Sequence, residues 1–93
     1  MDRVGPILTA SEIGRAVIAA IVQQNSNVEV QDRGSYLRVL VPRHCAFTRE
    51  AVERTLGRPF RLPSDLEIVM PSFSGTFSVS DDQAAWTFEG RHD

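Results

Sequence analysis

Residues 28–41 read VEVQDRGSYLRVLV, and this stretch predicts the most definite element of the fold. Polar and apolar residues alternate on both sides of residues 32–35, whose Asp, Gly and Ser are typical of a turn. In the second half, Leu37, Val39 and Val41 fall on one face, as they do in a strand with one buried side. The stretch therefore predicts a β-hairpin with its apolar face toward a core.

A helix is predicted on the N-terminal side of this hairpin, from about Ala10 to Gln24. Thr9 and Glu12 have the spacing of a capping box, in which both side chains satisfy free amides at a helix start. Ile18 and Val22 lie off the apolar stripe of this helix, so either a second element covers them or they face a partner. The stripe itself predicts the core-facing side and consists of Ile13, Ala16, Val17, Ala20 and Ile21.

The remaining elements are short and alternate in type along the chain. Residues 4–8 predict a short strand or an extended arm before the first helix. After the hairpin, Phe47 and Thr48 predict the start of a second helix, which Gly57 ends. Strands are then predicted at residues 66–70, 76–80 and 84–88, with an interruption at Pro71–Gly75 and a turn at residues 81–83.

Together these elements have the order β-α-β-β-α-β-β-β and predict an α+β fold. We expect a small two-layer sandwich, with two helices on a mainly antiparallel sheet. A length of 93 residues suits one domain. We expect its ordered core at about residues 4–88 and a polar tail at residues 89–93.

Composition argues against nucleic acid and membranes as partners. The net charge is −2, and the ten basic residues, all Arg, are scattered, whereas a nucleic-acid-binding domain has a basic patch. The longest apolar run, Ala16–Val22, is too short to span a bilayer. The N-terminus lacks the apolar stretch of a signal peptide, and the single cysteine cannot form an internal disulfide. These features predict a cytoplasmic protein.

The residue types that catalytic and metal sites need are scarce in this sequence. A metal centre needs three or four converging ligands, and the chain has two His and one Cys. His44 and Cys45 are adjacent, so on a strand they point to opposite faces, and His92 lies in the tail. Cys45 has no evident base, so we expect a small buried thiol rather than a nucleophile. The sequence predicts a cofactor-free, metal-free binding protein rather than an enzyme.

Four short motifs follow one another in a distinctive order: VGPI at residues 4–7, VQDRGSYLRV at 30–39, LGRPF at 56–60 and SFSG at 72–75. In this order and spacing they resemble the effector proteins of soluble bacterial multicomponent diiron monooxygenases. The resemblance is closest to the toluene-4-monooxygenase type and covers about Val4 to Phe88. Each motif alone is weak, whereas four in order are together fairly specific.

This resemblance implies a function that the residues alone do not show. Such effector proteins carry no cofactor and bind the diiron hydroxylase near its active site. They raise the rate and the coupling of O2-dependent hydrocarbon hydroxylation, and a reductase and in some systems a Rieske ferredoxin complete the system. Closeness to the toluene branch favours an aromatic substrate, and alkenes and phenols stay open.

The resemblance also implies which residues contact the hydroxylase. The segment that interrupts the predicted strand, Pro71-Ser72-Phe73-Ser74-Gly75, is expected at the hydroxylase surface. Val4, Gly5 and Pro6 are expected in a docking arm or an edge strand. Arg33 and Tyr36 are further candidates, because Arg and Tyr are enriched in the energetically dominant part of interfaces. The alternative is an α+β interaction or metabolite-sensing module that has no hydroxylase partner.

Overall fold

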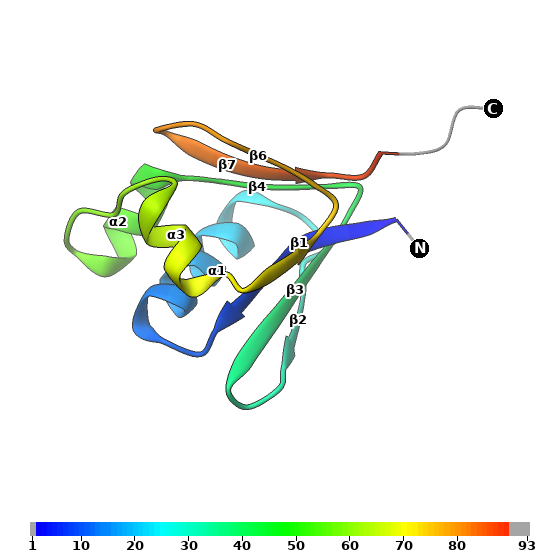
Figure 1. Ribbon diagram of the computed structural model, residues 1–93, viewed down its shortest axis with the longest axis horizontal. Helices are drawn as coiled ribbons and strands as arrows, with labels where there is room; N and C mark the ends of the chain where they lie inside the picture. Colours follow the sequence, from blue (N-terminus) through cyan, green and yellow to red (C-terminus); the bar gives the residue numbers. More distant parts are fainter. Residues whose placement is uncertain (1, 90–93) are drawn as a thin grey trace.

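Within residues 2–89, the part of the chain that the computed structural model describes, seven strands form two antiparallel sheets and three helices pack against them (Figure 1). The predicted α+β class and antiparallel pairing are confirmed, and residues 90–93 of the predicted tail, with His92, lie outside the described residues. The elements are β1 (Arg3–Thr9), α1 (Glu12–Gln24), β2 (Glu29–Asp32), β3 (Tyr36–Pro42), β4 (His44–Thr48), α2 (Arg49–Leu56), α3 (Ser64–Val69), β5 (Ser72–Ser74), β6 (Thr76–Val79) and β7 (Gln83–Thr87).

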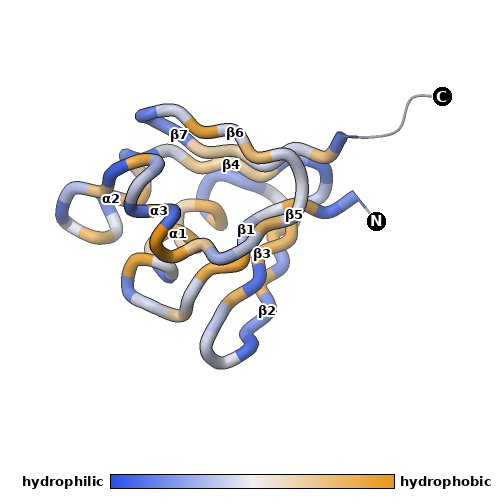
Figure 2. The backbone as a smooth tube through the Cα atoms, in the orientation of Figure 1, coloured by the Kyte–Doolittle hydropathy of each residue, from blue (hydrophilic) through white to orange (hydrophobic). Residues whose placement is uncertain are grey.

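The predicted hairpin is the pair β2–β3 and forms half of the larger sheet, whose strand order is β2-β3-β1-β5. Val30 lies opposite Val39, and the predicted apolar face of β3 is buried. Residues 4–8 form a strand rather than an extended arm, since β1 pairs with β3 from Arg3↔Pro42 to Thr9↔Tyr36. The central strands β1 and β3 are mostly hydrophobic, whereas β2 is mostly hydrophilic (Figure 2).

Helix α1 begins later than the capping-box spacing predicts. Its N-cap is Ser11, whose hydroxyl accepts a hydrogen bond from the Gly14 amide at 3.0 Å. Thr9 is instead the last residue of β1, opposite Tyr36. The start at Ala10 was wrong because the chain stays on the sheet beyond Thr9: the Ala10 amide donates to the Ser35 carbonyl at 3.0 Å, and the helix begins only after Ser11. The predicted core stripe is confirmed, with only Ile13 half-buried.

Strand β4 was not predicted, because its five residues run directly into helix α2. Phe47 belongs to β4 rather than to the helix start, and Cys45 lies opposite Trp86 of β7 in the smaller sheet, whose order is β4-β7-β6. Thr48 caps α2 as predicted, accepting a hydrogen bond from the Ala51 amide at 3.3 Å. Gly57 ends the helix in the left-handed conformation, with φ 73°.

The strand predicted at residues 66–70 is wrong: Ser64–Val69 form the short helix α3. Leu66 and Val69 are buried and lie three positions apart, which places them on one face of a helix. Alternation over residues 66–70 fits a strand equally well, so the local pattern could not separate the two. The helix count is therefore three rather than two within the described residues.

Candidate partner-binding surface

Strand β5 brings most of the predicted site residues together. It pairs with β1 in the register Gly5↔Ser74, Pro6↔Phe73 and Ile7↔Ser72. The N-terminal motif and the SFSG motif, far apart in sequence, are thus adjacent strands of one sheet (Figure 1). The family resemblance implied both motifs as site residues, and their contact comes from the fold.

Val4, Gly5 and Pro6 are buried in β1, the strand beside β5, rather than exposed for docking. Strand β1 runs between β3 and β5, so the expected docking arm or edge strand is in fact an interior strand. Val4 is 1% exposed, and Gly5 and Pro6 are also buried. An ideal Cβ on Gly5 would lie 2.3 Å from the Val39 carbonyl oxygen, so only glycine fits there. These residues position β5.

Gly75 forms the corner at which the chain passes from the larger sheet to the smaller one. It alone separates β5 from β6, and its backbone φ is +100°. An added Cβ would lie 2.7 Å from Val4 Cγ1 and 3.1 Å from the Thr87 carbonyl oxygen. Gly75 therefore rests directly on β1 and β7, and its lack of a side chain allows the two sheets to meet here.

Phe73 is the exposed end of a row of aromatic rings that leads into the core. Its side chain is 43% exposed, and its ring centroid lies 5.3 Å from that of Phe77. Phe77 stacks on the fully buried Trp86 at 5.3 Å, and Trp86 stacks on Phe47 at 6.0 Å. Rings at these separations attract one another beyond simple burial, so Phe73 is held in place from behind.

Ile68 of α3 is a large exposed apolar residue that sequence reasoning missed. Its side chain is 78% exposed, and only two residues separate α3 from β5. The strand predicted at residues 66–70 gave no reason to expect Ile68 on the surface. A signal for the helix was present, because Asp65 and Glu67, near the start of α3, are typical of a helix start. We refer to the exposed residues Ile68, Pro71, Ser72 and Phe73 as the Phe73 surface.

Arg33 and Tyr36 lie at the other end of the larger sheet. The Arg33 amide donates to the Tyr36 carbonyl at 2.9 Å and closes the turn of the β2–β3 hairpin, and both side chains are exposed. Tyr36 pairs with Thr9, three residues along β1 from Pro6, which is about 10 Å at the rise of a strand. The structure therefore does not bring these two residues to the Phe73 surface.

A second apolar surface lies between α1 and β2. Its groove has a volume of about 330 Å³ and is lined by Arg15, Ile18, Ala19, Val30, Asp32 and Leu37. Strand β2 comes beside the half-buried Ile18, whereas Val22 remains 52% exposed. Of the two residues off the apolar stripe of α1, Ile18 is thus partly covered by a second element, and Val22 is not.

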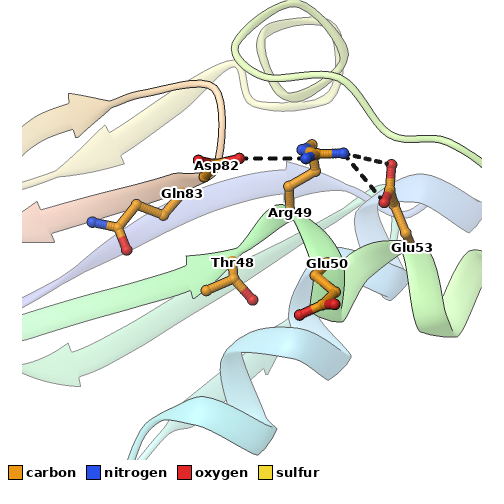
Figure 3. Close-up of a pocket in the computed structure, with 6 residues that line it drawn as sticks. All are labelled: Thr48, Arg49, Glu50, Glu53, Asp82 and Gln83. Atoms are coloured by element: carbon orange, nitrogen blue, oxygen red, sulfur yellow. Dashed lines mark hydrogen bonds and ion pairs between the residues drawn. The ribbon is translucent and has the colours of Figure 1, made fainter.

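A polar pocket at the start of α2 holds a set of paired charges (Figure 3). The Arg49 guanidinium contacts Asp82 at 3.3 Å and Glu53 at 3.2 Å, and these partners raise its pKa. The Arg49 amide donates to the Asp82 carbonyl at 2.7 Å, and Glu53 accepts from the Phe60 amide at 2.9 Å. Asp82 thus ties α2 to the β6–β7 turn and Glu53 ties it to the segment at Phe60, so both carboxylates have a structural role.

Cys45 and the residue types that ligate metals are the groups that could carry chemistry. Cys45 is buried as predicted, and burial raises its pKa to about 12, so it is a neutral thiol near pH 7. Among residues 2–89, no three His, Cys, Asp or Glu side chains converge in a way that could hold a metal ion. Over the same residues, no helix is long and apolar enough to cross a membrane.

Comparison of the sequence with known proteins identifies one family. Residues 2–87 match the model of the MmoB/DmpM family. The effector subunit of an alkene monooxygenase system from Xanthobacter autotrophicus (strain Py2) is 39% identical over 88 residues, which cover 92% of this chain and 86% of the relative.

Two solved structures, both of phenol hydroxylase–regulatory protein complexes, contain a chain with the same fold. The first superposes with a TM-score of 0.82 at 20% identity and covers 94% of this chain and 98% of its own. The second has a TM-score of 0.79 at 21% identity, with 92% and 99% covered. At these identities the match shows the fold.

Proposed function

This chain belongs to the MmoB/DmpM family, and we propose that it is the effector component of a multicomponent monooxygenase. In this role it binds the diiron hydroxylase near its active site, carries no cofactor, and raises the rate and coupling of O2-dependent hydrocarbon hydroxylation. The observation that supports this most is the 39% identity to an effector subunit of an alkene monooxygenase system. That relative favours an alkene alongside the aromatic substrate that the sequence motifs suggest.

An effector without its own chemistry must act through binding free energy. It changes a rate only if it binds two states of the hydroxylase unequally, and each tenfold change needs about 1.4 kcal/mol of difference. A standard interface takes about 800 Å² from each partner. The described surface of 5472 Å² can supply that area from one side of the molecule.

The Phe73 surface is the part of this chain that we assign to the hydroxylase. Phe73 is an aromatic side chain that is exposed yet held rigidly by Phe77, which lowers the entropy lost on binding. Ile68 adds a second apolar contact on α3. Ser72, Ser74 and Pro71 surround Phe73, and Gly75 sets the direction of the segment.

The other candidate residues have supporting roles in this proposal. Val4, Gly5 and Pro6 hold β5 from within the sheet. Arg33 and Tyr36 are exposed on the β2–β3 hairpin, and we assign them a place at the rim of the interface. We further propose that the protein forms one effector domain and works in the cytoplasm beside a reductase and, in some systems, a Rieske ferredoxin.

The test is substrate hydroxylation per NADH consumed by the cognate hydroxylase and reductase, with and without this protein. We expect a rise in both rate and coupling that saturates near one effector per hydroxylase active site. An unchanged rate, together with no complex on gel filtration, would contradict the proposal and favour an interaction or sensing module.

A further inference from the structure

Residues 72–79 form one continuous free edge that runs along both sheets. Strand β5 is the last strand of the larger sheet, β6 is the last strand of the smaller sheet, and only Gly75 separates them (Figure 1). Their inner sides pair with β1 and β7. Within residues 2–89, no hydrogen bond reaches the outer side of this segment. Its outward amides and carbonyls are therefore available to another chain.

The opposite edge of the smaller sheet is closed by side chains of α1 and the residue that follows it. The Asn25 side chain donates to the Ala46 carbonyl at 2.7 Å and accepts from the Ala46 amide at 3.1 Å. Gln24 accepts from the Thr48 amide at 2.8 Å. These two amide side chains occupy the positions that a further strand would take beside β4.

The opposite edge of the larger sheet carries charges. Strand β2 contains Glu29 and Asp32, and Arg33 follows directly. Charged side chains on an edge strand oppose pairing with another chain. Residues 72–79 read SFSGTFSV and contain neither a charge nor a proline. Of the sheet edges in the described part of the chain, this one alone lacks both kinds of protection.

Apolar anchors stand beside the free edge. Phe73 lies within it and is 43% exposed, and Ile68 on the preceding helix is 78% exposed. An added strand gains affinity from backbone hydrogen bonds and selectivity from the side-chain contacts next to it. The edge and its anchors together fit that mode of recognition.

We propose that an extended, uncharged segment of the hydroxylase adds as a further strand to the outer edge of residues 72–79, with an apolar side chain against Phe73. This inference rests on the proposed effector function and specifies how the partner is held. A second copy of this chain is a poor occupant, because β5 and β6 belong to two sheets that enclose one core. Two copies of such a bent edge diverge on either side of Gly75, whereas a flexible segment can follow the bend.

Charge on the edge tests the proposal. Ser78 is exposed on β6, opposite Ala85. We expect Ser78→Lys to weaken binding to the hydroxylase by at least about tenfold, since lysine protects edge strands from pairing. Ser78→Thr keeps a hydroxyl and should bind like wild type. Val30→Lys makes the same charge change on β2, the other edge strand of the larger sheet, and should also bind like wild type.

A binding titration of the hydroxylase with wild type and these variants has outcomes that separate this inference from the proposed function. Weakened binding by Ser78→Lys alone supports the strand addition. If Phe73→Ala weakens binding and Ser78→Lys does not, the edge proposal is wrong and the effector function stands. If wild type forms no complex, the effector function fails. A concentration-dependent dimer of wild type that Ser78→Lys abolishes would make a second copy the occupant and overturn the proposal.

Hydrogen–deuterium exchange on the wild-type complex provides a measurement that needs no variant. Binding should slow exchange of amides in residues 72–79 by about tenfold or more, because a slowly exchanging amide is hydrogen-bonded and opens rarely. Exchange in β2 should be unchanged. Unaltered exchange at residues 72–79 in a saturated complex would overturn the strand addition, even if Ser78→Lys fails to fold.

Discussion

Phe73 on the Phe73 surface and the two valines at the α1–β2 groove have similar exposed fractions, yet the two surfaces are built differently. Phe73 is 43% exposed, and Val30 and Val22 in and beside the groove are 40% and 52% exposed. Phe73 stands on a row of stacked rings and borders an uncharged strand edge. The groove is flanked by Arg15 and Asp32 and borders a charged strand. Exposure alone does not separate the two surfaces; the supporting row of rings and the open strand edge do, and on these two features we base the assignment of the Phe73 surface to the hydroxylase.

The largest expected effect comes from the corner that orients the Phe73 surface. We expect Gly75→Ala to lower the free energy of unfolding by about 3 kcal/mol, because a side chain at φ +100° is strained and its Cβ meets Val4. Gly57→Ala is the control, since Gly57 also has positive φ but nothing lies within 4 Å of an added Cβ. Urea denaturation measures both variants. Equal losses would show that the Val4 contact does not constrain the corner.

Removal of the Phe73 ring should show which of the two surfaces binds the hydroxylase. We expect Phe73→Ala to raise the Kd of the hydroxylase complex about 30-fold, or about 2 kcal/mol, as for a central aromatic contact. The matched control is Val22→Ala on the groove side, with less than a twofold change. Calorimetric titration of both variants measures this. If Phe73→Ala unfolds the domain while its folded fraction keeps full affinity, the ring belongs to the core rather than the interface.

Ile68 tests how far the Phe73 surface extends onto α3. We expect Ile68→Ala to weaken hydroxylase binding about fivefold, or about 1 kcal/mol, and to leave thermal stability unchanged because the side chain is 78% exposed. Thr55→Ala on α2, also at an exposed position, provides the control. An affinity equal to that of wild type would confine the surface to β5.

The smallest effect concerns Cys45, which is buried in the core. Burial raises its pKa from 9.0 to about 12. The unfolded thiol therefore loses its proton near pH 9 while the folded one keeps it, so folding stability falls as pH rises from 9 toward 12. We expect Cys45→Ala to lose about 0.8 kcal/mol less stability than wild type between pH 8 and about pH 9.5.

Denaturation at the two pH values tests this prediction, and hydroxylase coupling at pH 7 should be near normal for the variant. Identical pH dependence would mean that the thiol ionises equally in both states. A complete loss of coupling would instead assign Cys45 a chemical role.

The elements with a long, single period were predictable from the sequence. The β2–β3 hairpin alternates over two strands around one turn, and α1 carries an apolar stripe along its whole length. Strand β4 and helix α3 were not, because five or six residues carry too little periodicity and their patterns fit neighbouring or alternative elements. Pairing with β7 decided β4, and burial of Leu66 and Val69 on one side decided α3.

The site was only partly predictable for a related reason. The motifs identified Phe73 and Gly75, but not that Pro6 lies opposite Phe73 or that β1 is an interior strand. Those relations depend on strand pairing between distant segments, which local periodicity does not encode. The free edge follows from the strand order of two sheets and has no sequence signature beyond its lack of charge.

The central claim, that the Phe73 surface rather than the groove meets the hydroxylase, is tested most directly by site-specific cross-linking. A photoreactive phenylalanine analogue would replace Phe73 in one protein and Val22 in another, and each would be irradiated with the hydroxylase. We predict a cross-linked species from position 73 and none from position 22. Efficient cross-linking from position 22, with none from position 73, would place the hydroxylase at the α1–β2 groove and contradict the account.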